Sequence, residues 1–176
     1  MIPAVDLTDV AAIAARSSDL FRLEAQPTYL VEQEADDFAA WRRGDRTLLT
    51  PETNSWLAHI RDTTATGARW SRVRILDYPL TEYAECELHG YQANQRAGEL
   101  IRVADRAWSP ELDALREDFW MFDDTVVRMI YDQTGRFLRP EPAGALHPYQ
   151  EMRTAGLQRA IPLLDYLKGH EPRLMA

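Results

Sequence analysis

The densest hydrophobic pattern in the chain lies between residues 118 and 138, where apolar runs are joined by short turns. Residues 119–122 are aromatic or Met, and residues 126–131 form a second strand-like run. Asp123-Asp124 and the stretch ending at Gly135 have the composition of tight turns. The pattern predicts three consecutive antiparallel strands. Because the first two are apolar on both faces, helices are expected on both sides of the sheet.

A strand, a helix and a second strand are predicted immediately before this region. Residues 70–76 alternate along a strand, residues 79–98 have helical spacing, and residues 100–104 form a short apolar run. Two strands joined in this way imply a right-handed parallel crossover. The expected fold class is therefore α/β (α+β): a single domain whose mixed sheet has a parallel βαβ unit followed by an antiparallel meander, covered by helices.

The remaining patterns predict one more strand, at residues 29–31, and further helices. The helices are expected within residues 1–20, at 32–43, at 51–64, near 109–115 and at 152–167. The proline-rich run 139–150 is expected to leave the sheet as a surface connection. The resulting layout has an N-terminal helix in residues 1–20, an α/β core in 21–139, and a connection and C-terminal helix in 140–176 that pack on the same domain.

Composition and charge exclude several classes of function. The formal net charge of −8 and the pI near 5.0 argue against direct binding to nucleic acid, which requires a basic face. Cys86 is the only cysteine, so a disulfide framework is excluded and a reducing compartment is indicated. No apolar run approaches the roughly 20 residues that cross a bilayer, and the N-terminus carries acids. We expect a cytoplasmic protein that does not bind membranes.

The histidines and nucleophiles do not form a catalytic or metal-binding pattern. The four histidines fall in separate predicted elements and lack the spacing of a metal site; they are His59, His89, His147 and His170. No serine lies in a nucleophile elbow, and no glycine-rich phosphate loop is present. We therefore expect no metal, no cofactor and no catalytic residue, and the sequence favours a protein that is not an enzyme.

Arginines and aromatic residues are the better candidates for a functional surface. Alternation places Trp70, Arg72 and Arg74 on one strand face, which we interpret as a half-exposed surface that could receive a partner or an anionic ligand. The alternative is that the arginines pair with acids such as Glu99 and that the neighbouring tyrosines are core. The candidate partner-binding or ligand-binding residues are Trp70, Arg72, Arg74, Tyr83, Tyr91, Asn94, Asp118 and Arg128.

Arg128 interrupts an otherwise apolar predicted strand, where an unpaired guanidinium would be costly. If Asp123-Asp124 is the turn, Arg128 lies nearly opposite Phe119. Asp118 is one step away, so an ion pair between Asp118 and Arg128 is the simplest way to satisfy both. Among the tryptophans, Trp41 and Trp120 are expected in the core.

Five short motifs carry a resemblance to a known family. They are Gly67 followed by Arg72-Val73-Arg74, Pro79-Leu80-Thr81 with Tyr83, Tyr91 with Asn94, Ala97-Gly98-Glu99, and Asp118-Phe119-Trp120 with Phe122-Asp123. With these motifs, residues 21–139 resemble an uncharacterised family of small actinobacterial proteins. Members of that family are typically encoded beside a helix-turn-helix regulator, so the resemblance implies a regulatory protein partner. It supplies no catalytic residues.

A weaker likeness is to the phospholipase D superfamily. The order of RVRIL, AGELIRV and DFWMFDDTVV resembles the strand, helix, strand and hairpin arrangement of that superfamily. The His-x-Lys pair of the active enzymes is missing, and Asp118-Phe119-Trp120 stands in its place. The likeness therefore implies a non-catalytic version of that fold.

Two hypotheses of function follow. The first is a non-enzymatic regulatory protein whose acidic surface binds a basic helix-turn-helix regulator. The second is a sensor of a small anionic ligand, or a degenerate phospholipase D-like phosphodiesterase, that uses Arg72, Arg74 and Arg128 around an anionic group.

Overall fold

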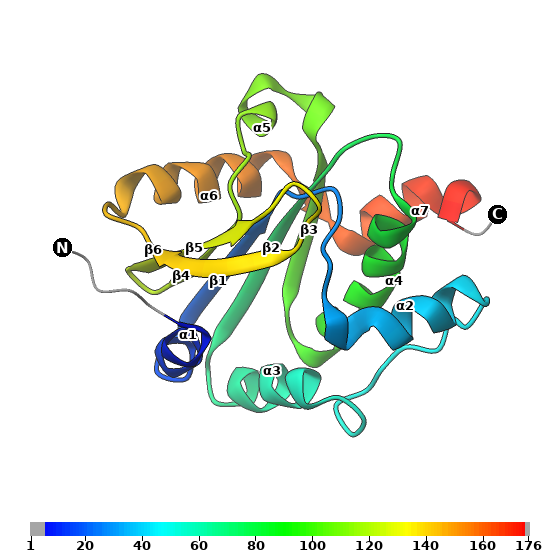
Figure 1. Cartoon of the computed structure of the whole chain (residues 1–176), viewed down its shortest axis with the longest axis horizontal. Coiled ribbons are helices and arrows are strands. Elements are labelled where there is room, and N and C mark those ends of the chain that lie inside the picture. The colour runs from blue at the N-terminus through cyan, green and yellow to red at the C-terminus, as the bar shows by residue number, and fades with distance from the viewer. Residues whose placement is uncertain (1–5, 175–176) are drawn as a thin grey trace.

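The computed structural model describes residues 6–174, which form a mixed seven-stranded sheet with helices on both faces (Figure 1). The strands are β1 (Asp19–Glu24), β2 (Arg69–Leu76), β3 (Leu100–Asp105), β4 (Phe119–Phe122), β5 (Thr125–Tyr131), β6 (Phe137–Pro142) and β7 (Ile161–Pro162). The helices are α1 (Leu7–Ala14), η1 (Glu32–Glu34), α2 (Ala35–Arg42), α3 (Ser55–Ala65), α4 (Glu82–Ala97), η2 (Arg106–Trp108), α5 (Pro110–Asp113), α6 (His147–Arg159) and α7 (Leu163–Leu174). The strand order is β6-β5-β4-β1-β2-β3-β7, which confirms the predicted α/β class.

The predicted βαβ unit is present as β2, α4 and β3, with β2 and β3 parallel. The helix α4 begins at Thr81, whose hydroxyl accepts a hydrogen bond from the Ala84 amide at 3.1 Å. It ends at Gly98, which has a φ of 117° and therefore reverses the chain into β3. A third parallel strand, β1, adjoins β2 on its other side.

The predicted meander is also present, as the antiparallel strands β4, β5 and β6. Asp123 has a φ of 50° in the two-residue turn between β4 and β5. Its carboxylate accepts hydrogen bonds from the amides of Ser18 at 3.2 Å and Asp19 at 2.9 Å. The turn is thus fastened to the start of β1. Because β4 pairs with β1, the meander and the parallel strands form one continuous sheet.

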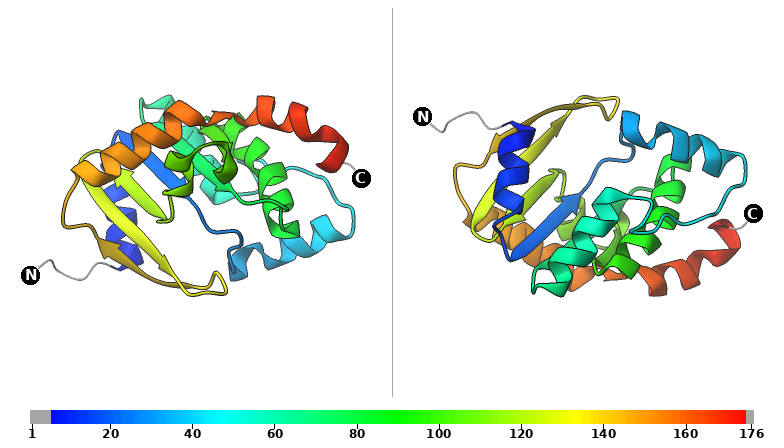
Figure 2. Two further views of the ribbon diagram at one scale, coloured as in Figure 1. Left: turned by 90° about the horizontal axis from the view of Figure 1, so that it is seen from above. Right: turned by 90° about the horizontal axis from the view of Figure 1, so that it is seen from below.

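Helices lie on both sides of the sheet (Figure 2), and apolar side chains pack beneath them on each face. On one face, residues such as Phe21, Val73 and Phe119 pack beneath α5 and α6. On the other, Trp70 and Trp120 pack with residues of α1, α3 and α4. Trp120 is 7% exposed, which confirms its prediction as a core residue, whereas Trp41 on the outlying helix α2 is only half-buried.

The first parallel strand lies earlier in the chain than predicted. Residues 29–31 are not a strand: Leu30 forms an isolated bridge with Arg136, and the ladder is formed by β1 at Asp19–Glu24. Pro27 lies between the two segments and cannot donate to a ladder. The N-terminal helix is shorter than predicted, since α1 spans Leu7–Ala14, and residues 1–5 of that prediction lie outside the described residues.

The helix predicted at 51–64 begins four residues later than expected, at Ser55. The motif at Thr50-Pro51 forms a turn, with the Thr53 amide donating to the Thr50 carbonyl at 3.0 Å. The cap of α3 is Asn54, whose side chain accepts from the Leu57 amide at 3.0 Å. Asn54 is as good a cap as Thr50. The helix that begins after Asn54 buries Leu57 and Ile60 against the sheet.

Two predictions about the C-terminal third are wrong. The proline-rich run does not leave the sheet at once, because Pro140 and Pro142 lie in the edge strand β6, where proline is tolerated. The single helix predicted at 152–167 is two helices, α6 and α7. They are separated by Ala160, which is extended, and by β7, in which Pro162 cannot continue the helical hydrogen bonds of α6.

Candidate functional site

A cluster of buried charges lies between the sheet and α4. Arg22 and Glu24 on β1 stand beside Arg72 and Arg74 on β2, and strand alternation directs all four to the same face. Helix α4 covers this face with side chains spaced along its inner side, and Glu99 follows its C-cap. The buried charge cluster, as we call it, consists of Arg22, Glu24, Arg72, Arg74, Glu87, Tyr91, Asn94 and Glu99.

Arg72 is fully paired. Its Nε and Nη2 atoms donate to the two carboxylate oxygens of Glu99 at 2.7 and 3.3 Å, and its Nη1 donates to Glu24 at 2.9 Å. Asn94 donates to the same Glu99 carboxylate at 2.8 Å. The ring centre of Tyr91 lies 4.7 Å from the guanidinium carbon, and the Tyr91 hydroxyl donates to Glu24. All three guanidinium nitrogens of Arg72 therefore donate to a carboxylate oxygen.

Arg74 is fully buried but incompletely paired. Its Nε donates to Glu87 at 2.7 Å, and its Nη1 donates to the carbonyl of Ile75 at 3.0 Å. Its Nη2 atom has no hydrogen-bond partner among the described residues. The ring of Tyr29 covers the guanidinium, with its centre 5.3 Å from the guanidinium carbon.

Tyr29 comes from the irregular segment 25–31 that follows β1. Its hydroxyl donates to the buried carboxyl of Asp118, which also accepts from the Ala25 amide at 2.9 Å. The next residue is held by a hydrogen bond from the Leu30 amide to the carbonyl of Gly135 at 2.9 Å. A Cβ atom at Gly135 would lie only 2.2 Å from the Thr28 carbonyl oxygen, so this close approach requires glycine.

Burial and charge move the pKa values of the carboxyls in opposite directions. Burial alone would raise the pKa of Glu24, but the attraction of the neighbouring arginines outweighs it and lowers the pKa to about 2. Burial raises the pKa of Glu87 to about 7 because Arg74 only partly compensates and the charge of Glu24 repels. Burial also raises the pKa of Asp118, to about 6, although Tyr29 donates to it.

The expectation of a half-exposed surface at Trp70, Arg72 and Arg74 is wrong, because α3 and α4 cover this face. The three side chains do share one face, but they are 2%, 4% and 0% exposed. Trp70 makes different contacts from the two arginines. Its indole N–H donates to Thr63 at 2.8 Å, and its ring packs edge-on against Trp56 and Trp120.

The structure brings together some of the predicted site residues. Arg72, Arg74, Tyr91 and Asn94 belong to the buried charge cluster, and Asp118 adjoins it through Tyr29.

Tyr83 lies at the outer edge of that group, where its hydroxyl donates to the exposed Glu34 at 2.8 Å and its ring contacts Tyr29.

The predicted ion pair between Asp118 and Arg128 is wrong. Arg128 does lie opposite Phe119, as predicted, but it therefore shares the face of Phe119, whereas Asp118 is directed to the other face. The guanidinium of Arg128 pairs instead with Glu117 and Glu141, each at 2.8 Å. Arg128 is thus separate from the buried charge cluster.

Several residues were not predicted from the sequence, namely Arg22, Glu24 and Glu87 in the cluster and Tyr29 beside it. A signal for two of them exists: Arg22 and Glu24 alternate with Phe21 and Leu23 in the same way as the arginines of β2. This signal was missed because the first strand was expected at residues 29–31.

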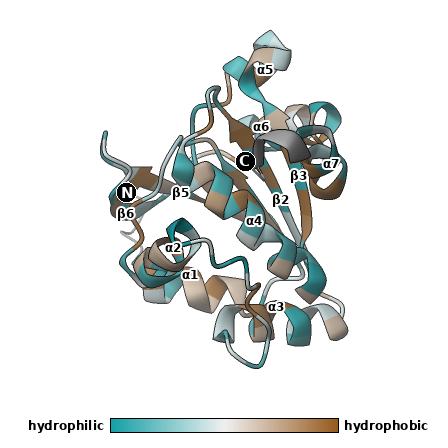
Figure 3. Cartoon of the chain, turned by 90° about the vertical axis from the view of Figure 1, so that its right-hand side faces the viewer, coloured by the Kyte–Doolittle hydropathy of each residue, from teal (hydrophilic) through white to brown (hydrophobic). Residues whose placement is uncertain are grey.

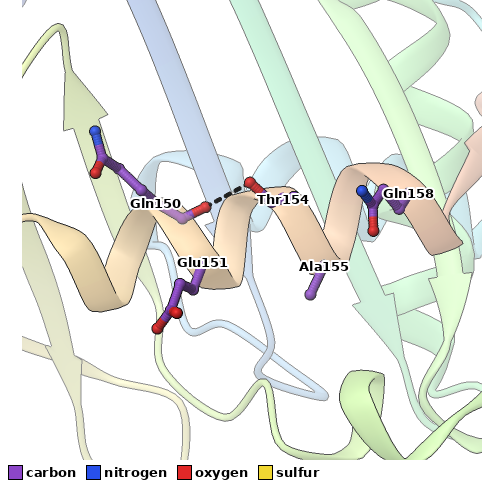
Figure 4. A pocket seen from close by; sticks show the side chains of 5 residues that line it. All are labelled: Gln150, Glu151, Thr154, Ala155 and Gln158. Atoms are coloured by element: carbon purple, nitrogen blue, oxygen red, sulfur yellow. Dashed lines mark hydrogen bonds between the residues drawn. The ribbon is translucent and has the colours of Figure 1, made fainter.

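Two surface hollows lie away from this cluster. A hollow of about 360 Å³ lies against the outer side of α6 and is lined by Gln150, Glu151, Thr154, Ala155 and Gln158 (Figure 4). A second, of about 480 Å³, lies between α6 and the turn after β4 and includes Asp19 and Arg153. Both are shallow and polar or lined by one helix, so neither has the buried walls typical of a ligand pocket.

Residues 6–174 contain no group of three or more His, Cys, Asp or Glu side chains placed to hold a metal ion. Within the same range, no helix has both the length and the apolar character needed to span a membrane. Burial raises the pKa of the half-buried Cys86 thiol to about 11, so the thiolate that nucleophilic chemistry needs is scarce at neutral pH.

The fold and the cluster define a single α/β domain with an ionic network buried beneath its crossover helix. Residues 9–168 match the family described as "Domain of unknown function (DUF6879)", and the chain belongs to this family. Comparison with curated proteins found no match, and neither did comparison with solved structures.

Proposed function

We propose that the protein is a non-enzymatic regulatory protein of the cytoplasm that binds a helix-turn-helix transcriptional regulator. One observation carries this proposal, the concentration of exposed acids at the start of α2. Together with a net charge of −8, it suits a partner with a basic surface, since complementary charge accelerates encounter and fixes orientation. The acidic surface, as defined here, consists of Glu32, Glu34, Asp36 and Asp37, all exposed.

The acidic surface belongs to an outlying element of the fold. Figure 3 looks onto this side of the molecule, where α2 lies at the surface with α4 beside it. Helix α2 has no fully buried residue, and it is held through half-buried aromatics, with the ring centres of Phe38 and Tyr83 5.9 Å apart. An element with so little burial can adjust to a partner without disturbing the core.

The proposal places the binding role on a different surface from the one predicted. Trp70, Arg72 and Arg74 cannot touch a protein partner, because their side chains are buried. Tyr83, one of the residues predicted for binding, donates a hydrogen bond to Glu34 of the acidic surface.

A charge reversal tests the proposal. The variant carries Glu32→Lys, Asp36→Lys and Asp37→Lys, and the matched control carries Asp124→Lys, Glu151→Lys and Asp165→Lys, three exposed acids elsewhere. Calorimetric titration with a purified helix-turn-helix regulator is expected to show binding at least about tenfold weaker for the first variant, and little change for the control. Equal affinities of the two variants would remove the acidic surface from the interaction.

A second candidate function, sensing of a small anion, is supported by the Nη2 atom of Arg74, which has no hydrogen-bond partner in the described part of the chain. Of the three arginines considered from the sequence, Arg72 is fully paired and Arg128 lies on the other face of the sheet. A degenerate phosphodiesterase of the phospholipase D type would be one form of such a sensor. Binding of sulfate to the purified protein tests this candidate, as described below.

A further inference from the structure

The two guanidinium edges on β2 are occupied differently. The Nε and Nη2 atoms of an arginine lie on one edge in a fixed fork, which matches the two oxygens of a carboxylate or the oxygens of a phosphate. Glu99 fills this edge of Arg72 with both oxygens. At Arg74, Glu87 occupies only Nε, and Nη2 is left without a partner among residues 6–174. One of the two nitrogens on this edge of Arg74 is therefore not used by Glu87.

An unpaired donor at full burial is costly to a protein, so its persistence suggests that a ligand satisfies it in use. Arg74 is completely buried, and Tyr29 is the side chain that covers its guanidinium. Tyr29 lies in an irregular segment whose other residues include the exposed Pro27 and Leu30. Entry of an anion would therefore require the Tyr29 ring to move.

The local charge decides when an anion can enter. The charged and titratable groups around Glu87 are Arg74 on β2, Glu24 on β1, Tyr29 in the segment after β1, and Tyr83, Cys86 and Tyr91 on α4. While Glu87 is ionised, it holds Nε and repels an entering anion. Protonated Glu87 has no charge to repel the anion and accepts from Nε more weakly, and with a pKa of about 7 the exchange falls at neutral pH.

We propose that Arg74 is a proton-linked oxyanion site, in which a phosphate, sulfate or carboxylate group takes both Nε and Nη2 while Glu87 takes up a proton from solvent and releases Nε. The inference rests on the second candidate function and adds to it the residue, the ligand class and the linkage to pH. The same chemistry would accept a free inorganic anion or the anionic group of a larger molecule.

Titration calorimetry with sulfate at pH 6, 7 and 8 tests the site, because the charge of sulfate is constant over this range. Measurement in two buffers of different ionisation enthalpy counts the protons taken up. We expect uptake of about one proton per sulfate at pH 8 and binding about tenfold weaker for each pH unit above 7. Phenyl sulfate, titrated in parallel, distinguishes an esterified anion from a free one by which of the two binds more tightly.

Glu87→Gln removes the titrating group while keeping its shape. It is expected to bind sulfate with the same affinity at pH 6, 7 and 8. The matched control, Glu82→Gln on the exposed side of the same helix, is expected to keep the wild-type pH dependence. Arg74→Lys is expected to weaken binding at least about tenfold, because lysine lacks the fork.

The outcomes separate the inference from the function on which it rests. Sulfate binding that is independent of pH in the wild type, or equally pH-dependent in Glu87→Gln, overturns the proton linkage and leaves anion sensing standing. Absence of sulfate binding by both wild type and Glu87→Gln overturns the site and the second candidate function together. Neither result bears on the acidic surface, whose test uses other variants and a protein ligand.

Discussion

Arg72 and Arg74 lie on the same face of β2, both almost completely buried, yet their guanidinium groups are satisfied to different extents. Arg72 has a carboxylate on its fork and a second on Nη1, whereas Arg74 donates to one oxygen of Glu87 through Nε, and its Nη2 has no partner among residues 6–174. The burial of an arginine therefore does not by itself tell whether it has a structural or a binding role. A buried arginine with every donor paired serves the fold, and one with an open donor is a candidate for binding.

The difference arises from where the two acids sit in the chain. Glu99 follows Gly98, whose backbone is fixed by its positive φ and by Thr64, since a Cβ atom at Gly98 would lie 2.9 Å from the Thr64 side chain. The Glu99 carboxylate is held further by Asn94. Glu87 lies within α4, with a neighbouring acid, Glu24, that disfavours its charge. The Glu99 carboxylate is therefore held in place, whereas the protonation state of Glu87 can change near neutral pH.

The largest expected effect is on the fully paired arginine. Glu99→Ala leaves the Arg72 guanidinium buried with only part of its counter-charge, and we expect the free energy of unfolding to fall by about 3–5 kcal/mol. Urea denaturation at pH 7 measures this change. A loss below about 1 kcal/mol would show that Glu24 alone satisfies Arg72, and the contrast between the two arginines would disappear.

Glu87→Gln is expected to change stability in a way that depends on pH. Burial raises the folded-state pKa of Glu87 to about 7, above the ordinary glutamate value of 4.5, so the folded protein binds the extra proton between these values. Wild-type stability conferred by neutral Glu87 is therefore present at low pH and is lost as the pH rises to about 7. As the pH rises from 5 to 8, the unfolding free energy of the variant should therefore rise by about 1–3 kcal/mol relative to that of the wild type. Thermal melts at both pH values check this, and a pH-independent difference would contradict it.

Tyr29→Phe keeps the ring over Arg74 and removes the hydroxyl that donates to Asp118. We expect a loss of about 1–2 kcal/mol in unfolding free energy, because a buried carboxyl loses a hydrogen bond. Tyr83→Phe is the matched control, since its hydroxyl bonds to an exposed acid and its loss should cost less. Equal effects of the two changes on urea denaturation would show that Tyr29 is no better anchored than its neighbour.

The smallest effect is expected at the third arginine. Arg128 is 32% exposed and pairs with Glu117 and Glu141, which are themselves 43% and 36% exposed. Water screens such pairs, so Arg128→Gln should cost less than about 1 kcal/mol. A larger loss in urea denaturation would mean that exposure does not separate this arginine from the buried pair.

Much of the sheet could be predicted because it is built from local patterns. The alternation of residues 70–76, the helix that ends at Gly98 and the turns at Asp123 and Gly135 all encode their structure within a few neighbouring residues. The same local reasoning failed at residues 29–31 and 152–167. Pro27 precedes the predicted strand, and Pro162 interrupts the predicted helix. The structure that forms there also depends on distant parts of the chain, through the pairing of β1 with β2 and the hydrogen bond from Arg102 to the Ala160 carbonyl at 2.9 Å.

The candidate site could be predicted only in part. Strand alternation correctly placed Arg72 and Arg74 on one face, and Glu99 was correctly considered as a partner. Alternation does not say which layer covers a face, so the exposure of these residues was predicted wrongly. Their acids also lie far away in sequence, with Glu24 separated from Arg72 by 48 positions. A buried ionic network is a tertiary property that depends on the packing of β1 and α4.

The prolines of β6 have a consequence for how this protein behaves in a crowded cell. The Ala143 amide donates inward to Val126 at 3.0 Å, so alternation directs the backbone nitrogens of Pro140 and Pro142 outward, away from β5. Neither can donate to a strand from another molecule. The free edge is therefore a poor template for intermolecular β-aggregation along this stretch.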